Sequence, residues 1–335
     1  MALTIFWAVI IFCLLIFVHE LGHFATAKAV GIKVNEFAIG MGPVLLRSTK
    51  GETEYSLRAF PIGGYVKMEG EEENSDDERA FNNKPTWAKA IVVVAGSLMN
   101  LITAIVILTL VFFFMGFPGN VVSEVSEGAP AMEAGIIEGD RIIEINGEPI
   151  VTWDEIIEKI SGSEGDSIQI KVERDQQIVV INTGVSIDET GRRIIGITPA
   201  YEKKPFQALK MGFISTYSMG IMMLEYLGVL LTGGGSTADL MGPVGIVSTI
   251  GDFARMGFAY LANLTALISL NLAIVNMLPF PALDGGRLLF MAIRKITGKA
   301  ITDEMENKIH FLGLMLLFAL MIWITVQDVG RVMIK

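Results

Sequence analysis

The stretch LLIFVHELGHFATAK, residues 14–28, places two histidines and a glutamate in the most apolar part of the N-terminal region. Residues 2–18 contain no Asp, Glu, Lys, Arg or His, so the stretch continues a segment long enough for a membrane-spanning helix, which needs about 20 mostly apolar residues. Ionisable side chains are costly inside a membrane and commonly mark a functional site there. The stretch therefore predicts a membrane helix that carries chemistry.

The whole chain has the composition of a membrane protein. Of its 335 residues, 52% are hydrophobic and 19% are charged, and the mean hydropathy is +0.53, which is too apolar for an ordinary soluble protein. Three further stretches lack charged side chains and histidine, at 90–123, 256–283 and 311–327. We therefore expect four spanning helices, at about 4–27, 90–117, 257–280 and 311–328.

Charge and cysteine content exclude several classes of protein. The net charge of −10 comes largely from EGEEENSDDER, residues 69–79, which predicts a solvated loop, and without a basic patch no nucleic-acid partner is expected. The single cysteine, Cys13, excludes an intrachain disulfide. The first basic residue is Lys28, so the N-terminal segment lacks the positive start of a cleavable signal peptide and is expected to stay attached.

Residues 19–23 form the motif H-E-x-x-H. Histidines four residues apart share one helix face and can bind one zinc ion, with the adjacent glutamate as general base. The alternative is a pair of packed or interfacial histidines, which would carry a desolvation cost without a compensating use. The motif therefore predicts one zinc ion per chain on His19 and His23, with Glu20 as the base.

A catalytic zinc ion takes three protein ligands and keeps one open position. Two residues could supply the third ligand, namely His310 at the entrance to the fourth span and Asp284 within NMLPFPALDGGRLL, residues 276–289. Asp284 is favoured because it ends an uncharged stretch, after prolines that break a helix and before glycines that free the backbone to turn the carboxylate inward. An ordinary cytoplasmic turn is the alternative reading of Asp284.

The basic residues predict how the chain threads the membrane. The loop 28–89 carries nine Lys and Arg, and the loop between the third and fourth spans is also basic. Basic loops stay in the cytoplasm, so both termini face outside and the metal site lies near the cytoplasmic side. Residues 206–231 are apolar enough for a fifth span, but Lys210 and Glu225 interrupt them, and a fifth span would move Asp284 to the opposite face from His19. We expect an amphipathic membrane-surface helix there, within a linker at 201–255.

Residues 118–200 contain more charged residues than the flanking segments, and apolar and polar residues alternate within them. The Asn146-Gly147 pair is a hairpin signal, and SIQIKVERD and QIVVINT alternate as strands do, so a small β-rich module is expected outside the membrane. The module resembles a PDZ domain. That resemblance implies capture of peptide C-termini by strand addition, with the carboxylate loop at Ile194, Ile195, Gly196 and Ile197. A module that only filters substrates by size is the open alternative.

The chain as a whole resembles the site-2 protease family of intramembrane zinc metalloproteases, and more closely its bacterial regulator-of-sigma-E branch. The resemblance rests on FVHELGHF, FAIGMGP, FPIGGYVKM, AGSLMN and NMLPFPALDGGRLL in this order around the spans. It implies a polytopic α-helical protein of the bacterial cytoplasmic (inner) membrane with four transmembrane helices, a re-entrant β-hairpin and one extracytoplasmic PDZ domain. The core would then consist of 1–117, with the β region at about 36–68, and 256–335.

The resemblance also implies roles for individual residues. His19, His23 and Asp284 would bind Zn²⁺ and Glu20 would be the catalytic base. Substrate-binding candidates come from FAIGMGP and FPIGGYVKM after the first span and from the end of the third span; they are Gly40, Gly42, Gly63, Gly64, Tyr65 and Asn276.

The implied activity is hydrolysis of peptide bonds within transmembrane segments of single-span membrane proteins, such as anti-sigma factors or signal-peptide remnants, after a first extracytoplasmic cut. A membrane zinc transporter or sensor is one alternative, but it leaves Glu20 without a role. A non-catalytic PDZ scaffold is another, but it leaves the whole H-E-x-x-H and Asp284 set unexplained.

Overall fold

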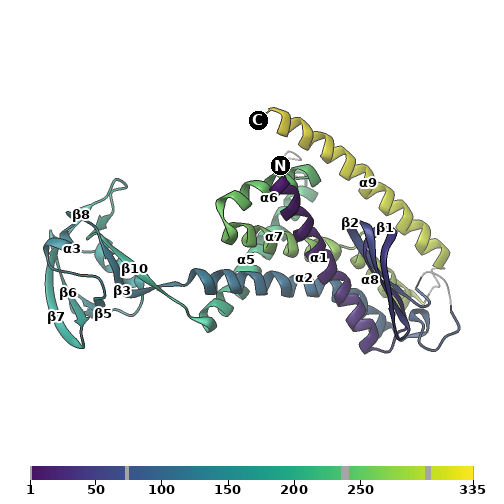
Figure 1. Cartoon of the computed structure of the whole chain (residues 1–335), viewed down its shortest axis with the longest axis horizontal. Helices are drawn as coiled ribbons and strands as arrows, with labels where there is room; N and C mark the ends of the chain where they lie inside the picture. Colours follow the sequence, from purple (N-terminus) through teal and green to yellow (C-terminus); the bar gives the residue numbers. More distant parts are fainter. Residues whose placement is uncertain (1, 72–74, 235–240, 299–302, 335) are drawn as a thin grey trace. The chain divides into compact units, whose positions relative to one another are not determined.

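The structure, a computed structural model, describes residues 2–71, 75–234, 241–298 and 303–334, and the chain forms two compact units (Figure 1). Unit 1 comprises Met1–Val111 and Leu209–Lys335, and unit 2 comprises Phe112–Ala208. Unit 2 is thus an insertion between two halves of unit 1.

Five helices among the described residues are long and apolar enough to cross a membrane. They are α1 (Ala2–Ala29), α2 (Thr86–Met115), α5 (Pro205–Leu231), α7 (Phe258–Asn276) and α9 (Asp303–Ile334). The helix expected on the membrane surface, α5, is a single continuous helix that meets the same criterion of length and hydropathy as the other four. The count of four spans therefore stays a prediction.

Two shorter helices complete the helical part of unit 1. They are α6 (Pro243–Met256), which forms in a region expected to be linker, and α8 (Asp284–Thr297). A proline in the first turn and Gly257 at the end delimit α6. Its buried Ile250 packs with Leu15 of α1 and Leu261 of α7, so the helix is stabilised by contacts distant in sequence.

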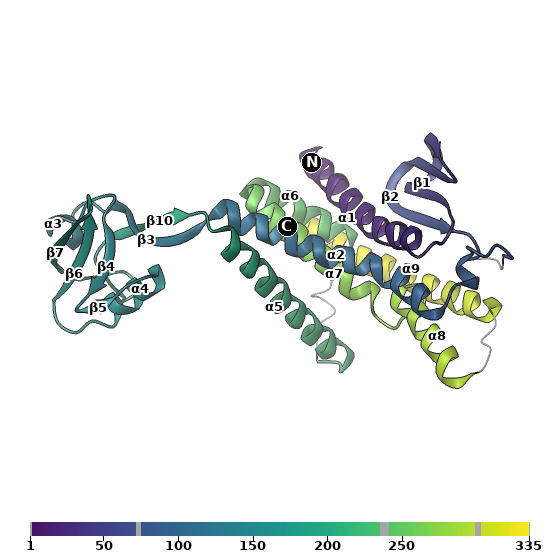
Figure 2. The same cartoon turned by 90° about the horizontal axis from the view of Figure 1, so that it is seen from below.

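Contacts within unit 1 determine the relative directions of its helices. Gly251 of α6 lies against Thr4, so the start of α7 is near the start of α1, and Ser269 of α7 donates a hydrogen bond to the Asn100 carbonyl of α2 at 2.7 Å (Figure 2). Because Asp284 follows α7 and meets His19, α1 and α7 run in the same direction. This is the relation that the threading argument requires of these two helices.

A long antiparallel hairpin follows α1, with β1 (Val34–Lys50) and β2 (Thr53–Met68). The first part of β1 pairs with two segments of β2, because Ile39 lies opposite both Leu57 and Gly64. The hairpin packs on α1 and α2 through a core that contains Phe37, Val66 and Val92. It covers the range expected for the re-entrant β region, whose depth in the membrane stays a prediction.

The acidic run after β2 is only partly a solvated loop. Residues 72–74 lie outside the described residues, but Glu69 accepts hydrogen bonds from Asn35 and Ser75, and Glu71 pairs with Arg287 of α8. The expectation of a fully solvated loop is wrong for these two carboxylates because they have nearby donors in the fold. The short 3₁₀ helix Phe81–Asn83 leads from the run to α2.

Unit 2 is the β-rich module expected at 118–200. Its main sheet has the strand order β10-β3-β4-β6-β7, with β5 beside β4. The strands are β3 (Phe117–Val125), β4 (Arg141–Ile145), β5 (Glu148–Pro149), β6 (Ser167–Arg174), β7 (Gln177–Gly184) and β10 (Ile197–Glu202), and β8 (Ser186–Ile187) pairs separately with β9 (Arg193–Ile194). Positive φ angles at Asn146 and Gly147 form the predicted hairpin turn between β4 and β5.

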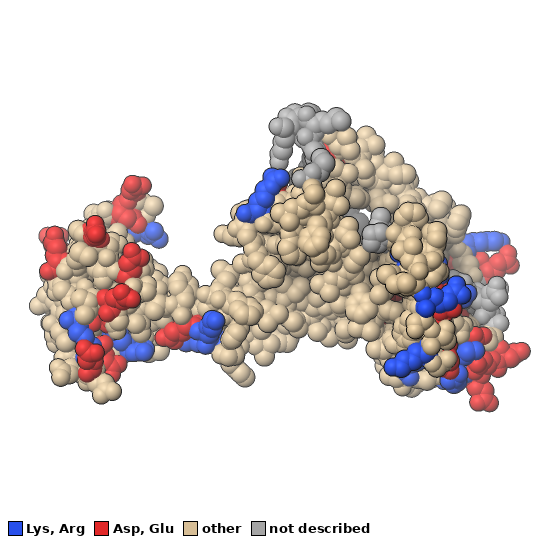
Figure 3. Space-filling view, viewed as in Figure 1, with Lys and Arg blue, Asp and Glu red and all other residues tan. Residues whose placement is uncertain are grey.

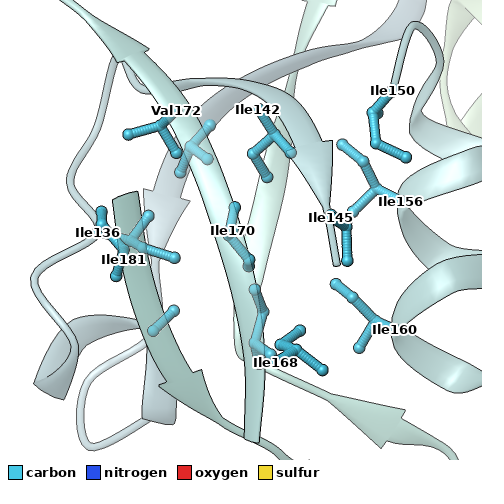
Figure 4. Packing of buried hydrophobic residues seen from close by; sticks show 13 residues of the cluster. Ile136, Ile142, Ile145, Ile150, Ile156, Ile160, Ile168, Ile170, Val172 and Ile181 are labelled. Carbon is cyan, nitrogen blue, oxygen red and sulfur yellow. The ribbon is translucent and has the colours of Figure 1, made fainter. Parts of the chain in front are cut away.

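The core of unit 2 is built largely from isoleucine (Figure 4). Alternate residues of β6, Ile168 and Ile170, are buried as the period-2 pattern predicts. Two helices cover the sheet, α3 (Pro130–Glu133) and α4 (Trp153–Ser161), and a capping box at Thr152 and Glu155 begins α4.

On the surface of unit 1, charged side chains gather around the hairpin and α8, and the helical middle shows few (Figure 3).

Candidate metal centre

His19, His23 and Asp284 come together from α1 and from the first residue of α8. The Nε2 atoms of the two histidines are 3.2 Å apart, and Oδ2 of Asp284 lies 3.3 Å from His19 Nε2 and 3.6 Å from His23 Nε2. The three side chains are mostly buried, with 13% exposure at each histidine and 19% at Asp284. The structure therefore brings together the three residues that the sequence predicts as ligands.

These three atoms fit a zinc ion. Two imidazole nitrogens and one carboxylate oxygen are a donor set of catalytic zinc, and a tetrahedron with metal–ligand bonds of about 2.0–2.1 Å has edges of about 3.3–3.4 Å. The three measured distances, 3.2 to 3.6 Å, are close to such edges. The Asp284 Oδ2 atom is also buried without a hydrogen-bond partner, as expected of a group that is complete only with a metal.

The crossing of α1 and α2 leaves space for the histidines only because of two glycines. A Cβ atom on Gly22 would lie 2.4 Å from the Ala95 carbonyl oxygen, and one on Gly96 would lie 2.3 Å from His23 Nε2. Small residues let membrane helices approach this closely. The backbone of α2 thus forms one wall of the metal site.

The same helix orients both imidazole rings. Nδ1 of His23 is 2.8 Å from the Val92 carbonyl oxygen, which can only accept, so Nδ1 carries the proton and Nε2 is left to bind a metal. Nδ1 of His19 lies 3.3 Å from the Asn100 amide nitrogen, and Oδ1 of the same amide is fully buried without a partner. The Val92 backbone carbonyl and the Asn100 side chain, both on α2, therefore meet the outer nitrogens of the two candidate ligand rings.

Asp284 is held in place by the tight loop before it. A Cβ on Gly285 would lie 2.3 Å from the carbonyl oxygens of Met277 and Leu278, and one on Gly286 would lie 2.3 Å from that of Phe280. The two glycines are thus needed for space, whereas the sequence argument gave them a role in turning the backbone. The left-handed residue of this loop is Ala282, with a φ of +77°.

Glu20 lies beside the hairpin. A Cβ atom on Gly64 of β2 would be 3.1 Å from Glu20 Cγ and 3.3 Å from Ile16 Cγ2, so the strand backbone passes directly over the carboxylate-bearing side chain. Of the predicted substrate-binding residues, Gly64 is therefore the one that the structure places next to the candidate base.

The other predicted hairpin residues form a glycine-rich bend. Gly40, Gly42 and Gly63 all have φ angles between +83° and +85°, and the first two lie against Phe60. The Tyr65 hydroxyl donates to Glu36 Oε2 at 2.7 Å, and Glu36 also pairs with Arg58, so this tyrosine belongs to a polar network inside the hairpin.

The remaining predicted residues lie in α7 and in unit 2. Asn276 is the half-buried last residue of α7. In unit 2, Ile195 is buried and its carbonyl accepts from the Ala131 amide, and the Gly196 carbonyl accepts from the Ser126 amide. Ile194 is exposed and Ile197 pairs with Val125, so these residues cross from the surface into the main sheet.

Sequence reasoning missed Gly96 and Asn100 as parts of the site, although both lie in the quoted stretch AGSLMN. Their spacing of four residues could have indicated that they lie on the same face of an apolar helix, because residues four apart share a helix face. His310, the weighed alternative to Asp284, is not in the ligand group; its Nδ1 accepts a hydrogen bond from the Ala282 amide at 2.8 Å.

Comparison with known proteins shows the family to which the chain belongs. The model of "Peptidase family M50" matches residues 7–320. A protein of Clostridium acetobutylicum is 40% identical over 325 residues, which covers 96% of each chain. The "Regulator of sigma-W protease RasP" of Bacillus subtilis is 31% identical and covers 98% of each chain. The solved PDZ domain of the SdrC-like protein of Listeria innocua is 30% identical, covering 26% of this chain and 99% of that one, with a TM-score of 0.23.

The family match covers nearly the whole chain, and the described part of the chain holds a donor set of catalytic zinc. The chain therefore belongs to peptidase family M50, the site-2 protease family, and is an intramembrane zinc metalloendopeptidase.

Proposed function

We propose that this protein cuts peptide bonds within transmembrane segments of single-span membrane proteins, with zinc on His19, His23 and Asp284 and with Glu20 as general base. The observation that supports it most is the convergence of the three candidate ligand atoms, two from the apolar helix α1 and one from the first residue of α8. His19 lies about 15 Å along α1 from its last residue, Ala29, at about 1.5 Å per residue. If α1 spans the membrane up to this end, the reacting groups would lie below its surface, where the bond to be cut would also lie.

Each protein group has a separate task in this proposal. Bound zinc supplies Lewis acidity, which polarises the scissile carbonyl and makes water more acidic. Glu20 accepts the proton of the attacking water and donates it to the leaving amine. The carbonyl of Val92 accepts from Nδ1–H of His23. With zinc on Nε2 of His19, the Asn100 amide would turn its buried, unpartnered oxygen toward Nδ1–H of that ring and accept in the same way.

The substrate must be extended before it is cut, because a transmembrane helix hides its peptide bonds in internal hydrogen bonds. The glycine-rich part of the hairpin supports a role in binding that extended segment by strand addition, since Gly64 passes next to Glu20. Gly40, Gly42, Gly63 and Tyr65 would shape the same edge, and Asn276 would contact the segment from the end of α7.

Unit 2 and the membrane orientation complete the proposal. We place unit 2 and both termini outside the cytoplasm, in the bacterial inner membrane, with the metal site near the cytoplasmic side. Unit 2 would act after a first extracytoplasmic cut, by binding the new C-terminus at Ile194–Ile197 or by excluding uncut proteins by size. The name of the Bacillus subtilis relative supports regulators of sigma factors as one substrate class, beside signal-peptide remnants.

A reconstituted assay tests the proposed activity. Candidate single-span proteins, shortened on the outer side, are incubated with the full-length protein in lipid vesicles, with and without a zinc chelator. We expect cleavage within the spanning segment that the chelator stops and added zinc restores. Cleavage only outside that segment, or cleavage that persists in the chelator, would contradict the proposal.

A further inference from the structure

The loop before Asp284 holds one residue, Ala282, in a left-handed backbone conformation that the loop's own residues do not stabilise. Asp284 begins α8 directly after residues 277–283, and Ala282 in this loop has a φ of +77°. L-residues other than glycine, asparagine and aspartate seldom adopt this left-handed conformation, and alanine has no polar side chain to support it locally. An interaction from outside the loop is therefore needed to hold Ala282.

His310 of α9 supplies that interaction. The Ala282 backbone N–H donates to Nδ1 of His310 at 2.8 Å, so Nδ1 is an acceptor and the proton of the neutral ring is on Nε2. The imidazole also packs against the ring of Phe290 in α8, with centroids 5.4 Å apart. One side chain of α9 thus contacts both the loop and the helix that Asp284 begins.

A second contact of the same helix supports this relation without involving the imidazole. A Cβ atom on Gly313 would lie 2.6 Å from both the Cβ and the carbonyl oxygen of Pro281. Residues three apart share a helix face, so His310 and Gly313 form one surface against Pro281 and Ala282. The helix α9 is therefore fitted closely to the backbone of this loop.

We propose that His310 is a positioning residue of the metal site. By accepting the hydrogen bond of Ala282, it fixes the loop and so holds the Asp284 carboxylate against His19 and His23. The proposal rests on the proposed role of Asp284 as a zinc ligand, and it gives His310 a role through the loop backbone instead of as a ligand. It also makes α9 a structural part of the active site.

Three substitutions separate the acceptor atom from the packing of the ring. In His310→Asn, Oδ1 takes the place of Nδ1, whereas in His310→Gln the acceptor lies one bond further out, near the place of Nε2. His310→Phe keeps an aromatic ring against Phe290 but has no acceptor. The zinc dissociation constant of each full-length variant is measured in detergent micelles by competition with a chromophoric chelator, and thermal unfolding shows whether each is folded.

We expect His310→Phe and His310→Gln to raise the zinc dissociation constant about 10-fold or more, the range found when an outer-shell partner is lost, and His310→Asn to restore it. Unchanged binding in the Phe and Gln variants would overturn the proposal. Equal loss in the Asn and Phe variants would also overturn it, because the acceptor would then not matter. The Asn and Gln pair keeps the test valid if His310→Phe does not fold.

Asp284→Ala in the same assay separates this inference from the ligand assignment. If that variant keeps its zinc, the role of Asp284 is wrong and the positioning role falls with it. If it loses zinc while all three His310 variants bind as the unchanged protein does, only the positioning role is wrong.

Discussion

Gly96 of α2 lies against the metal-facing nitrogen of His23: a single Cβ atom at residue 96 would be 2.3 Å from His23 Nε2 and 2.8 Å from His19 Cε1. Contacts this short do not occur in folded proteins, so a side chain here must displace either the imidazoles or the helix. The absence of a side chain at residue 96 thus lets α2 pass close to both imidazole rings.

The first prediction concerns this contact. Gly96→Ala should abolish zinc binding, although the same exchange in an exposed helix position normally stabilises by about 1 kcal/mol. Gly220→Ala is the matched control, because Gly220 lies in α5 and its Cβ would meet nothing within 4 Å. Zinc content by elemental analysis measures both. Full zinc in the Gly96 variant would show that α2 does not line the site.

The second prediction concerns Asn100. We expect Asn100→Leu to weaken zinc binding 10- to 100-fold or so, because the outer nitrogen of His19 loses its polar partner. Asn100→Asp should bind zinc well, since a carboxylate oxygen can accept from Nδ1–H. Chelator competition measures the two constants. If leucine is tolerated as well as aspartate, Asn100 does not orient His19.

The third prediction concerns the metal ligands. His23→Ala should lose zinc, because one of only three protein ligands is removed, and excess chelator should remove zinc from the unchanged protein. Elemental analysis of purified protein is the measurement. Undiminished zinc in His23→Ala would refute the ligand assignment.

The fourth prediction separates binding from catalysis. Glu20→Gln should keep the zinc and the fold but lower the rate of cleavage by a factor of about 10² to 10⁴, because the nearly isosteric amide cannot accept a proton from water. Zinc content and turnover in vesicles are measured on the same preparation. Turnover close to that of the unchanged protein would exclude Glu20 as the base and favour a zinc sensor or transporter.

The fifth prediction tests the threading. In a Cys13→Ser background, a cysteine at residue 234 should react with a membrane-impermeant thiol reagent applied from outside, and a cysteine at residue 298 should not. The first position follows α5 and the second directly follows α8. The reverse pattern would mean that α5 crosses the membrane and that the assumed orientation is wrong.

Features that depend only on residues close together in the sequence could be predicted from it. The pair His19 and His23 follows from the helical repeat, and the turn at Asn146-Gly147 follows from the backbone preference of those two residues. Asp284 could be chosen because it is a lone carboxylate at the end of an apolar stretch.

Features that depend on tertiary contact could not be predicted. Helix α6 was expected to be linker, although Pro243 and Gly257 mark its ends, because its packing partners Leu15 and Leu261 lie far away in the sequence. The double pairing of β1 at Ile39 requires β2 to fold back, which alternation alone does not indicate. The left-handed Ala282 is contrary to the preference of alanine, and the contacts that accompany it, from His310 and Gly313 of α9, come from far along the chain.

The insertion of unit 2 between the two halves of unit 1 has a consequence for biosynthesis. His23 and Asp284 are 261 positions apart in the chain, so at about 5–20 residues per second the ribosome needs roughly 13–52 s to pass from one to the other. During that interval the nascent chain carries the H-E-x-x-H motif without Asp284. If Asp284 is the third zinc ligand, as proposed, the protease would lack a complete metal site until most of the chain has been made.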